Sequence, residues 1–69
     1  MKLSDNMVRA FADAETMMHA ANGADHEYWL GKCVGIADAV AIMLDVEWIT
    51  AHNMLGNAAN HMRKQHDAA

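Results

Sequence analysis

Apolar residues recur along the first third of the chain with the spacing of an α-helix. Between residues 5 and 21 they return every three or four positions, which indicates one buried stripe on an otherwise polar helix. We expect Ser4 or Asp5 to cap this helix, and Asn22-Gly23 to end it in the left-handed conformation. The predicted stripe comprises Leu3, Met7, Ala10, Ala14, Met17 and Ala21, with Phe11 and Met18 beside it.

The middle of the chain is more apolar than an ordinary surface helix. We predict a helix over 26–45, with Asp25 as its N-cap. Two apolar rows lie side by side on it, so it should be buried on at least two sides. The rows are Trp29, Cys33, Ile36, Val40 and Met43, and Leu30, Val34, Ala37, Ala41 and Leu44.

A third row on this helix consists of small residues. Gly31, Gly35 and Ala39 follow one another at four-residue spacing, although a glycine inside a helix costs about 1 kcal/mol relative to alanine. This spacing predicts a ridge where another helix backbone approaches closely. We therefore expect a homo-oligomer packed through the second helix, with Gly31, Gly35, Ala39 and Trp29 at the self-association surface.

The last apolar pattern predicts a helix over 51–65. Thr50 is the expected cap, with Ile49 and Met54 as the hydrophobic staple around it. The apolar side comprises Ala51, Met54, Leu55, Ala58, Ala59 and Met62. The sequence as a whole predicts an all-α fold, a compact three-helix bundle with residues 1–69 as a single helical domain.

Length and composition limit how such a domain can be stabilised. A chain of 69 residues forms a marginal core by itself. Cys33 is the only cysteine, so no disulfide can form within the chain, and we expect it to be a small core residue. A bound metal and association with other chains are the other common ways to stabilise so small a domain.

Charge and hydropathy exclude several partners. Nine acidic and five basic side chains give a net charge of −4, which argues against direct nucleic-acid binding. The apolar run 28–44 is short for a membrane span and contains Lys32 and Asp38. Because residues 1–6 bring charge before any apolar segment, we expect no secretory signal and a cytoplasmic location, in the host cell if the chain is phage-encoded.

Asp38 is the charged residue within the apolar second helix. We expect it to face water. The alternative is an ion pair with Lys32 or Arg63.

The candidate chemistry is sparse. The histidines are His19, His26, His52, His61 and His66, and no two of them have the three- or four-residue spacing of a helical metal site. A site joining His19 and His26 across the turn with Glu15, or a pH-sensitive interface, remains an alternative. No phosphate loop, catalytic triad or Cys-x-x-Cys pair occurs, so we expect no enzyme, no metal and no cofactor.

A polar stripe on the last helix is the clearest candidate for a partner surface. Asn53, Asn57, Asn60 and Lys64 are spaced by four, three and four residues, so they share one face. Asparagine is a mediocre helix former, and a solvated face without a role would more cheaply use Glu, Lys or Gln. We interpret the stripe as a protein-partner interface, with a plain solvated face as the alternative.

These features predict a small acidic protein–protein interaction module that binds and modulates or inhibits a larger host protein. In its short, acidic, helical character the chain resembles the accessory proteins of bacteriophages and mobile elements, including inhibitors of host defence. The alternatives are a self-assembling structural or small-ligand-binding helical oligomer, and a histidine-based metal- or pH-responsive regulator.

Overall fold

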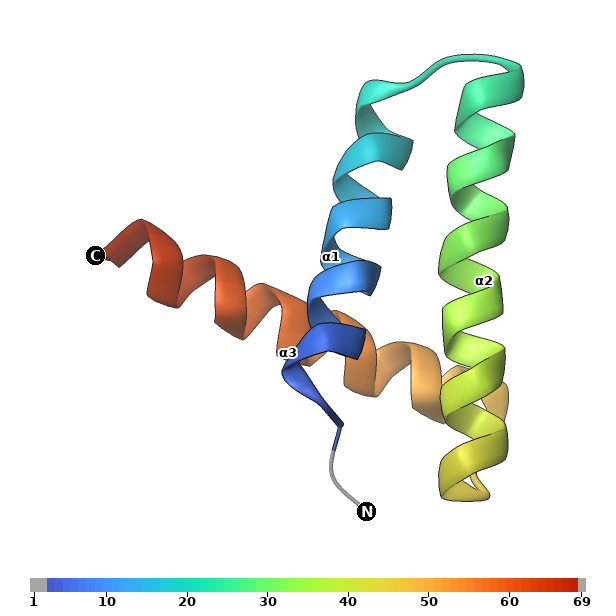
Figure 1. The fold of residues 1–69 in the computed structure, drawn as a ribbon, viewed down its shortest axis with the longest axis vertical. Coiled ribbons are helices and arrows are strands. Elements are labelled where there is room, and N and C mark those ends of the chain that lie inside the picture. Colours follow the sequence, from blue (N-terminus) through green and yellow to red (C-terminus); the bar gives the residue numbers. More distant parts are fainter. Residues whose placement is uncertain (1–2, 69) are drawn as a thin grey trace.

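The computed structural model describes the backbone of residues 3–68 and the side chains of residues 3–65. This part of the chain forms three α-helices and no strand: α1 (Asp5–Ala20), α2 (Ala24–Leu44) and α3 (Trp48–Ala68). Helices α1 and α2 lie side by side as a hairpin, and α3 runs across one face of that hairpin (Figure 1). The predicted all-α architecture with three packed helices is confirmed.

Capping explains where α1 and α2 begin. The hydroxyl of Ser4 accepts a hydrogen bond from the Met7 N–H at 3.1 Å, which caps α1. Gly23 holds the N-cap position of α2 with φ 62° and ψ −131°, a conformation that essentially only glycine adopts. The prediction that Asp25 caps this helix is therefore wrong, because α2 begins at Ala24 and Asp25 lies in its first turn.

The end of α1 also differs from the prediction. The helix stops at Ala20, and Ala21 is extended with φ −97° and ψ 159°. The turn therefore leaves α1 through extended backbone before it reaches Asn22. Gly23 is needed to start α2, not to end α1.

A left-handed residue joins α2 to α3. Asp45 has φ 54° and ψ 51°, and the Val46 N–H donates to the Ala41 carbonyl at 3.0 Å. This six-to-one hydrogen bond is the Schellman ending of a helix. The turn is complete after Glu47, so α3 starts at Trp48 instead of residue 51.

The early start of α3 overturns the predicted cap. Thr50 lies inside the first turn of α3 and does not precede it. The predicted staple is also wrong, because the side chain of Ile49 is exposed. A staple needs Ile49 outside the helix, whereas here it is the second helical residue.

The core lies where the three helices meet. Each helix packs against the other two. The buried apolar residues are Val8, Phe11, Ala12, Ala14, Cys33, Ala37, Val40, Ala51, Leu55 and Ala59.

The buried face of α1 is turned from the predicted stripe. Val8 and Ala12 are buried, whereas Ala10 and Met17 are exposed, so the prediction is wrong for the latter two. The cause is the position of α3, which packs beside Ala12 and leaves the Ala10 side open.

Arg63 connects α3 to α1 by hydrogen bonds and an ion pair. Its Nη2 group donates to the Ala12 carbonyl at 3.0 Å and to Glu15 Oε1 at 3.2 Å, and the latter contact is an ion pair. The alternative pairing of Arg63 with Asp38 is therefore wrong. Asp38 is exposed, as expected.

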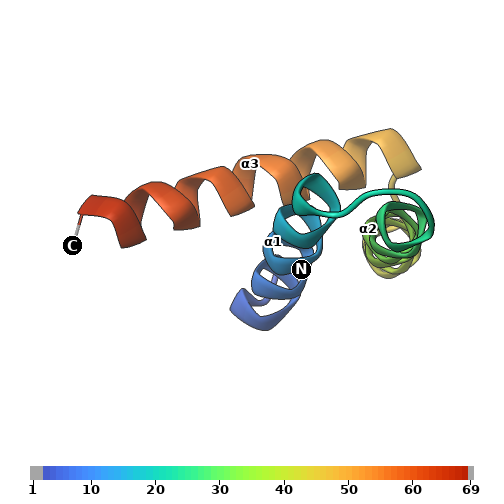
Figure 2. The same cartoon turned by 90° about the horizontal axis from the view of Figure 1, so that it is seen from above.

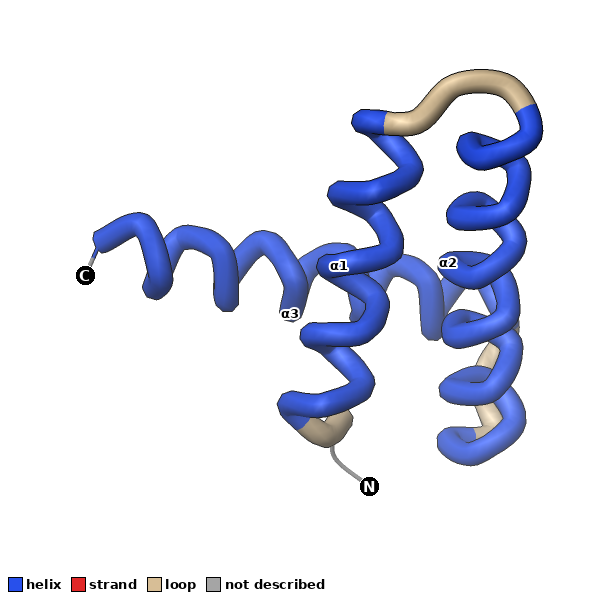
Figure 3. The backbone as a smooth tube through the Cα atoms, turned by 45° about the horizontal axis from the view of Figure 1, so that its top comes forward, coloured by secondary structure: helices blue, strands red, loops and turns tan. Residues whose placement is uncertain are grey.

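The molecule is thin because α3 covers only one side of the hairpin. Its principal extents are 34 × 31 × 16 Å. Seen from above, α3 forms one layer while α1 and α2 form the other (Figure 2), and the tube in Figure 3 shows the same crossing. Among the described residues, no helix is long and apolar enough to cross a bilayer.

Candidate functional site

A groove runs between α1 and α2 on the open side of the hairpin. It has a volume of about 590 Å³, and α3 contributes no residue to its lining. In Figure 1 the two helices stand in front of α3, so this side faces the viewer. The groove is lined by Ala10, Asp13, Ala14, Trp29, Lys32, Gly35, Ile36 and Ala39.

Three of the four predicted self-association residues line this groove. Trp29, Gly35 and Ala39 belong to its wall, while Gly31 is exposed one turn earlier on α2. A Cβ atom built on Gly31 or Gly35 would meet nothing within 4 Å. The close approach that the small-residue row predicts therefore does not occur within one chain, and self-association stays a prediction.

Large apolar side chains remain exposed along α2. Ile42 is 81% exposed, Tyr28 58% and Met43 49%. On α1, Met17 is 45% exposed. Apolar side chains of this size left in water make α2 a candidate interaction surface.

The two apolar rows of α2 are only partly covered. Cys33 and Val40 of the first row and Ala37 of the second are buried. Leu30 and Val34 of the second row are exposed, so the predicted burial of the whole row is wrong. The reason is that α3 reaches α2 only near its C-terminal half, as Figure 1 shows.

A cation lies over the aromatic pair at the groove. Lys32 Nζ is 5.8 Å from the Tyr28 ring centroid and 5.6 Å from that of Trp29. The two rings form an edge-to-face pair with centroids 5.0 Å apart. Cation–π contacts of this kind contribute about 0.5–1 kcal/mol at exposed sites, so they hold the lysine beside the groove.

The asparagine stripe lies on the outer face of α3. Asn53, Asn57, Asn60 and Lys64 are all exposed. Asn57 stands about 200° around the helix from buried Leu55, so the stripe points away from the hairpin. Asn60 Oδ1 accepts a hydrogen bond from Arg63 Nη1 at 3.2 Å. The stripe is free of packing within the chain and remains a predicted partner surface.

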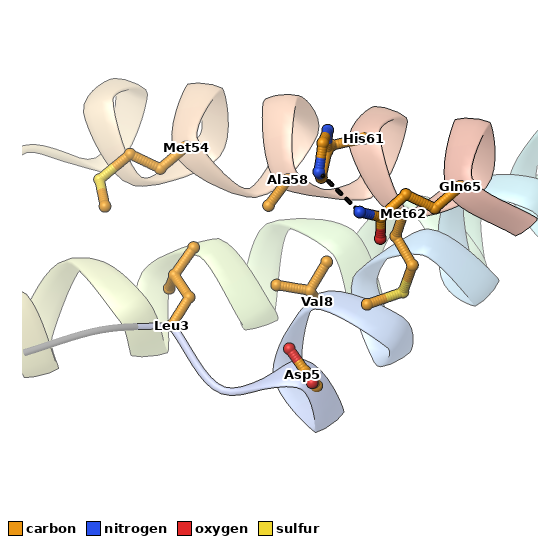
Figure 4. Close-up of a pocket in the computed structure, with 8 residues that line it drawn as sticks. All are labelled: Leu3, Asp5, Val8, Met54, Ala58, His61, Met62 and Gln65. Atoms are coloured by element: carbon orange, nitrogen blue, oxygen red, sulfur yellow. Dashed lines mark hydrogen bonds between the residues drawn. The ribbon is translucent and has the colours of Figure 1, made fainter.

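A second hollow, which the sequence did not predict, lies between the start of α1 and the outer half of α3. It has a volume of about 380 Å³, and Gln65 Nε2 donates to His61 Nε2 at its rim, at 3.1 Å (Figure 4). The flexible side chains of Met54 and Met62 form part of its apolar lining. Its lining comprises Leu3, Asp5, Val8, Met54, Ala58, His61, Met62 and Gln65. Met54 and Met62 were the sequence signal available for this hollow, but their proximity to Leu3 depends on how α3 crosses α1.

The histidines have separate surroundings. His26 Nδ1–H donates to the Met18 carbonyl at 2.8 Å, near the end of α1. His52 stacks on Trp48 with centroids 5.0 Å apart and meets the Phe11 ring edge-on at 5.6 Å. Over the described residues, no group of three His, Cys, Asp or Glu side chains could hold a metal ion. The side chain of His66 lies outside the described residues.

Cys33 sits in the core with its thiol covered. Burial raises the pKa of this thiol above its usual 9.0, and the nearby negative charge of Glu15 raises the pKa further. A thiol held protonated is a poor nucleophile. The position therefore suits the small core residue that the sequence predicts.

Comparison with known proteins adds no relative. No protein-family model matches the chain, and neither curated proteins nor solved structures give a significant match. Function must therefore be argued from the surfaces described above.

Proposed function

We propose that this chain is a small, non-enzymatic protein–protein interaction module that acts in the cytoplasm. It self-associates through α2 and binds a larger protein, which it modulates or inhibits. The observation that carries the proposal is the uncovered apolar side of the hairpin, where Tyr28, Ile42 and Met43 are exposed. Desolvating such side chains contributes about 25 cal/mol for each Å² removed from water, and this favours association with another protein surface.

The proposed surface for the larger partner is the asparagine stripe on α3. It lies on the opposite side of the molecule from the groove, so a self-associated chain can still present it. Amide side chains both donate and accept hydrogen bonds, and Lys64 adds one positive charge. Such a surface suits a polar protein face better than an apolar one.

Size and charge support a regulatory role. The net charge of −4 disfavours contact with phosphate backbones. A short acidic helical chain of this type resembles phage and mobile-element accessory proteins, some of which inhibit host defence. We propose the same class of activity for this chain.

The test is a pull-down from host cells with matched variants. The double variant Asn57→Ala with Asn60→Ala should keep full helicity and lower partner recovery about tenfold, since each lost interfacial hydrogen bond contributes about 0.5–1.5 kcal/mol. Asn22→Ala, an exposed amide in the α1–α2 turn, is the control and should recover the partner fully. Equal recovery by both variants would show that the stripe is merely solvated.

A self-assembling oligomer that binds a small apolar ligand is the second candidate. The hollow between Met54 and Met62 favours it, because a methionine wall adapts to differently shaped apolar ligands. Titration with an environment-sensitive apolar dye tests this candidate. Met62→Lys should abolish dye binding there, and dye binding that survives the substitution would place the dye elsewhere.

A further inference from the structure

We propose that the occupant of the α1–α2 groove is a second copy of this chain, related by a two-fold axis that runs along the groove. In this dimer, α1 of each protomer packs on α2 of its partner. The inference rests on the self-association in the proposed function and specifies its geometry. It differs from packing α2 on α2, which the small-residue row alone would favour.

The two sides of the groove carry complementary charges. Two charged side chains line the groove: Asp13 on its α1 side and Lys32 on its α2 side. No ion pair among the described residues involves either of them. A two-fold axis along the groove places α1 of one chain against α2 of the other. Asp13 therefore faces the partner's Lys32, and Lys32 faces the partner's Asp13. Each contact therefore occurs twice in the symmetric interface.

The alternative two-fold axis gives the opposite result. An axis across the groove would place α1 on α1 and α2 on α2. With the axis at the level of these residues, Asp13 would approach a second aspartate, and Lys32 a second lysine. Like charges brought together at an interface cost several kcal/mol. The charges therefore select the first arrangement.

The groove is lined largely by small residues. Ala10, Ala14, Gly35 and Ala39 belong to its lining, and a Cβ on Gly35 would meet nothing within 4 Å. Small side chains allow helix axes to approach to the near end of the usual 8–10 Å range. The partner's helices then cover Trp29 and Ile36, which line the same groove and are half-buried in one chain.

The chain exposes more surface than a compact monomer of its size. A compact monomer of 7.6 kDa exposes about 4300 Å², whereas this chain exposes 4835 Å². The excess of about 500 Å² is of the order of the roughly 600–1000 Å² that each partner buries in a stable interface. The chain is only 16 Å thick along its short axis. Two stacked hairpins would form a four-helix core with an α3 helix on each outer side.

The apolar pattern of α1 also favours this dimer. Its apolar stripe includes Ala10 and Met17, which are exposed in one chain. Both project to the open side of the hairpin. The second copy covers them, so the predicted stripe is buried in the dimer even though two of its six residues are exposed in a single chain.

The test is a charge swap read by sedimentation equilibrium. Asp13→Lys and Lys32→Asp should each raise the dimer dissociation constant about tenfold, because two symmetric pairs become repulsive. The double variant should return to within about threefold of the natural chain. Asp38→Lys is the control, since Asp38 is exposed, lies outside the groove and changes the net charge by the same amount as Asp13→Lys.

Three outcomes would overturn the proposal. A natural chain that stays monomeric at millimolar concentration removes the dimer. If the single variants leave the dimer dissociation constant unchanged, or if the double variant does not restore it, the pairing of Asp13 with Lys32 is wrong. Self-association itself would still stand. Partner recovery by the asparagine variants is measured separately, so failure of the dimer and failure of partner binding are distinguishable.

Cross-linking tests the geometry where a charge variant fails to fold. Ala10→Cys and Ala39→Cys are made separately in a Cys33→Ala chain and mixed with a short bismaleimide. The mixture should cross-link α1 to α2 of different chains at least fivefold more than either variant alone. Stronger self-linking of Ala10→Cys than of the mixture would indicate α1 on α1 and overturn the proposal.

Discussion

The buried thiol of Cys33 makes the stability of the folded chain depend on pH. Cys33 is buried, and burial together with the negative charge of Glu15 raises its pKa. The unfolded chain, with the lower thiol pKa, therefore loses this proton first as the pH rises. The contribution of Cys33 to stability is full below about pH 9 and declines as the pH increases towards the folded-state pKa.

This coupling gives a prediction at the residue scale. Between pH 8.5 and 10.5 the free energy of unfolding of the natural chain should fall with a slope of up to about 1.4 kcal/mol per pH unit from this one proton. Cys33→Ala should lack that part of the slope. Urea unfolding of both proteins across the range measures the difference. Identical slopes would mean that the thiol titrates alike in the folded and unfolded chains.

Arg63 illustrates what sequence position alone hides. The sequence offered Asp38 as its alternative partner, whereas the guanidinium binds Ala12 and Glu15 on α1. Glu15 lies 48 residues earlier in the chain, and the pairing depends on α3 crossing the hairpin. A helical pattern assigns a face to a residue, but it does not tell which helix will lie against that face.

At the scale of the element, the end of α2 carries a correctable strain. Asp45 adopts the left-handed conformation, which is unfavourable for a residue with a Cβ atom. Asp45→Gly should therefore raise the free energy of unfolding by about 0.5–1 kcal/mol. Asp38→Gly, in the exposed middle of the same helix, is the matched control and should lower it by about 0.3–0.5 kcal/mol. Urea denaturation measures both, and destabilisation by Asp45→Gly would contradict the prediction.

The helices themselves could be predicted from periodicity, but their ends could not be predicted as well. α1 ends within one residue of the prediction. α2 starts two residues early because Gly23 acts as its N-cap, and α3 starts three residues early. The second difference follows from Asp45, since its left-handed turn uses an aspartate where glycine is the usual signal. Thr50 therefore looked like a cap although the helix had already begun.

At the scale of the whole molecule, the proposed dimer makes thermal stability depend on concentration. Because only folded chains associate, the melting temperature should rise by about 4–5 °C for each tenfold increase in protein concentration. Gly35→Leu places a bulky side chain in the groove, where a single chain has space. Its melting temperature should be nearly independent of concentration. Calorimetry from 10 μM to 1 mM tests both, and a constant melting temperature for the natural chain would contradict a dimer.

The candidate site was predictable in part. The small-residue row pointed to Gly35 and Ala39, and both line the groove. The α1 side of the groove was not predicted, since Ala10 was assigned to the core of a single chain but is exposed, whereas Ala14 is buried as predicted. Periodicity separates apolar from polar faces, but it does not separate a face buried by the chain itself from one left open.

The short turn between α1 and α2 also bears on how quickly the chain folds. Only three residues, 21–23, separate the two helices. The α1–α2 hairpin therefore forms through contacts that are local in sequence, and closing its turn costs little conformational entropy. Chains dominated by such contacts fold in microseconds to milliseconds. We therefore expect the hairpin to form early, and the hydrogen bond from Arg63 to the Ala12 carbonyl, 51 residues away, to form after it.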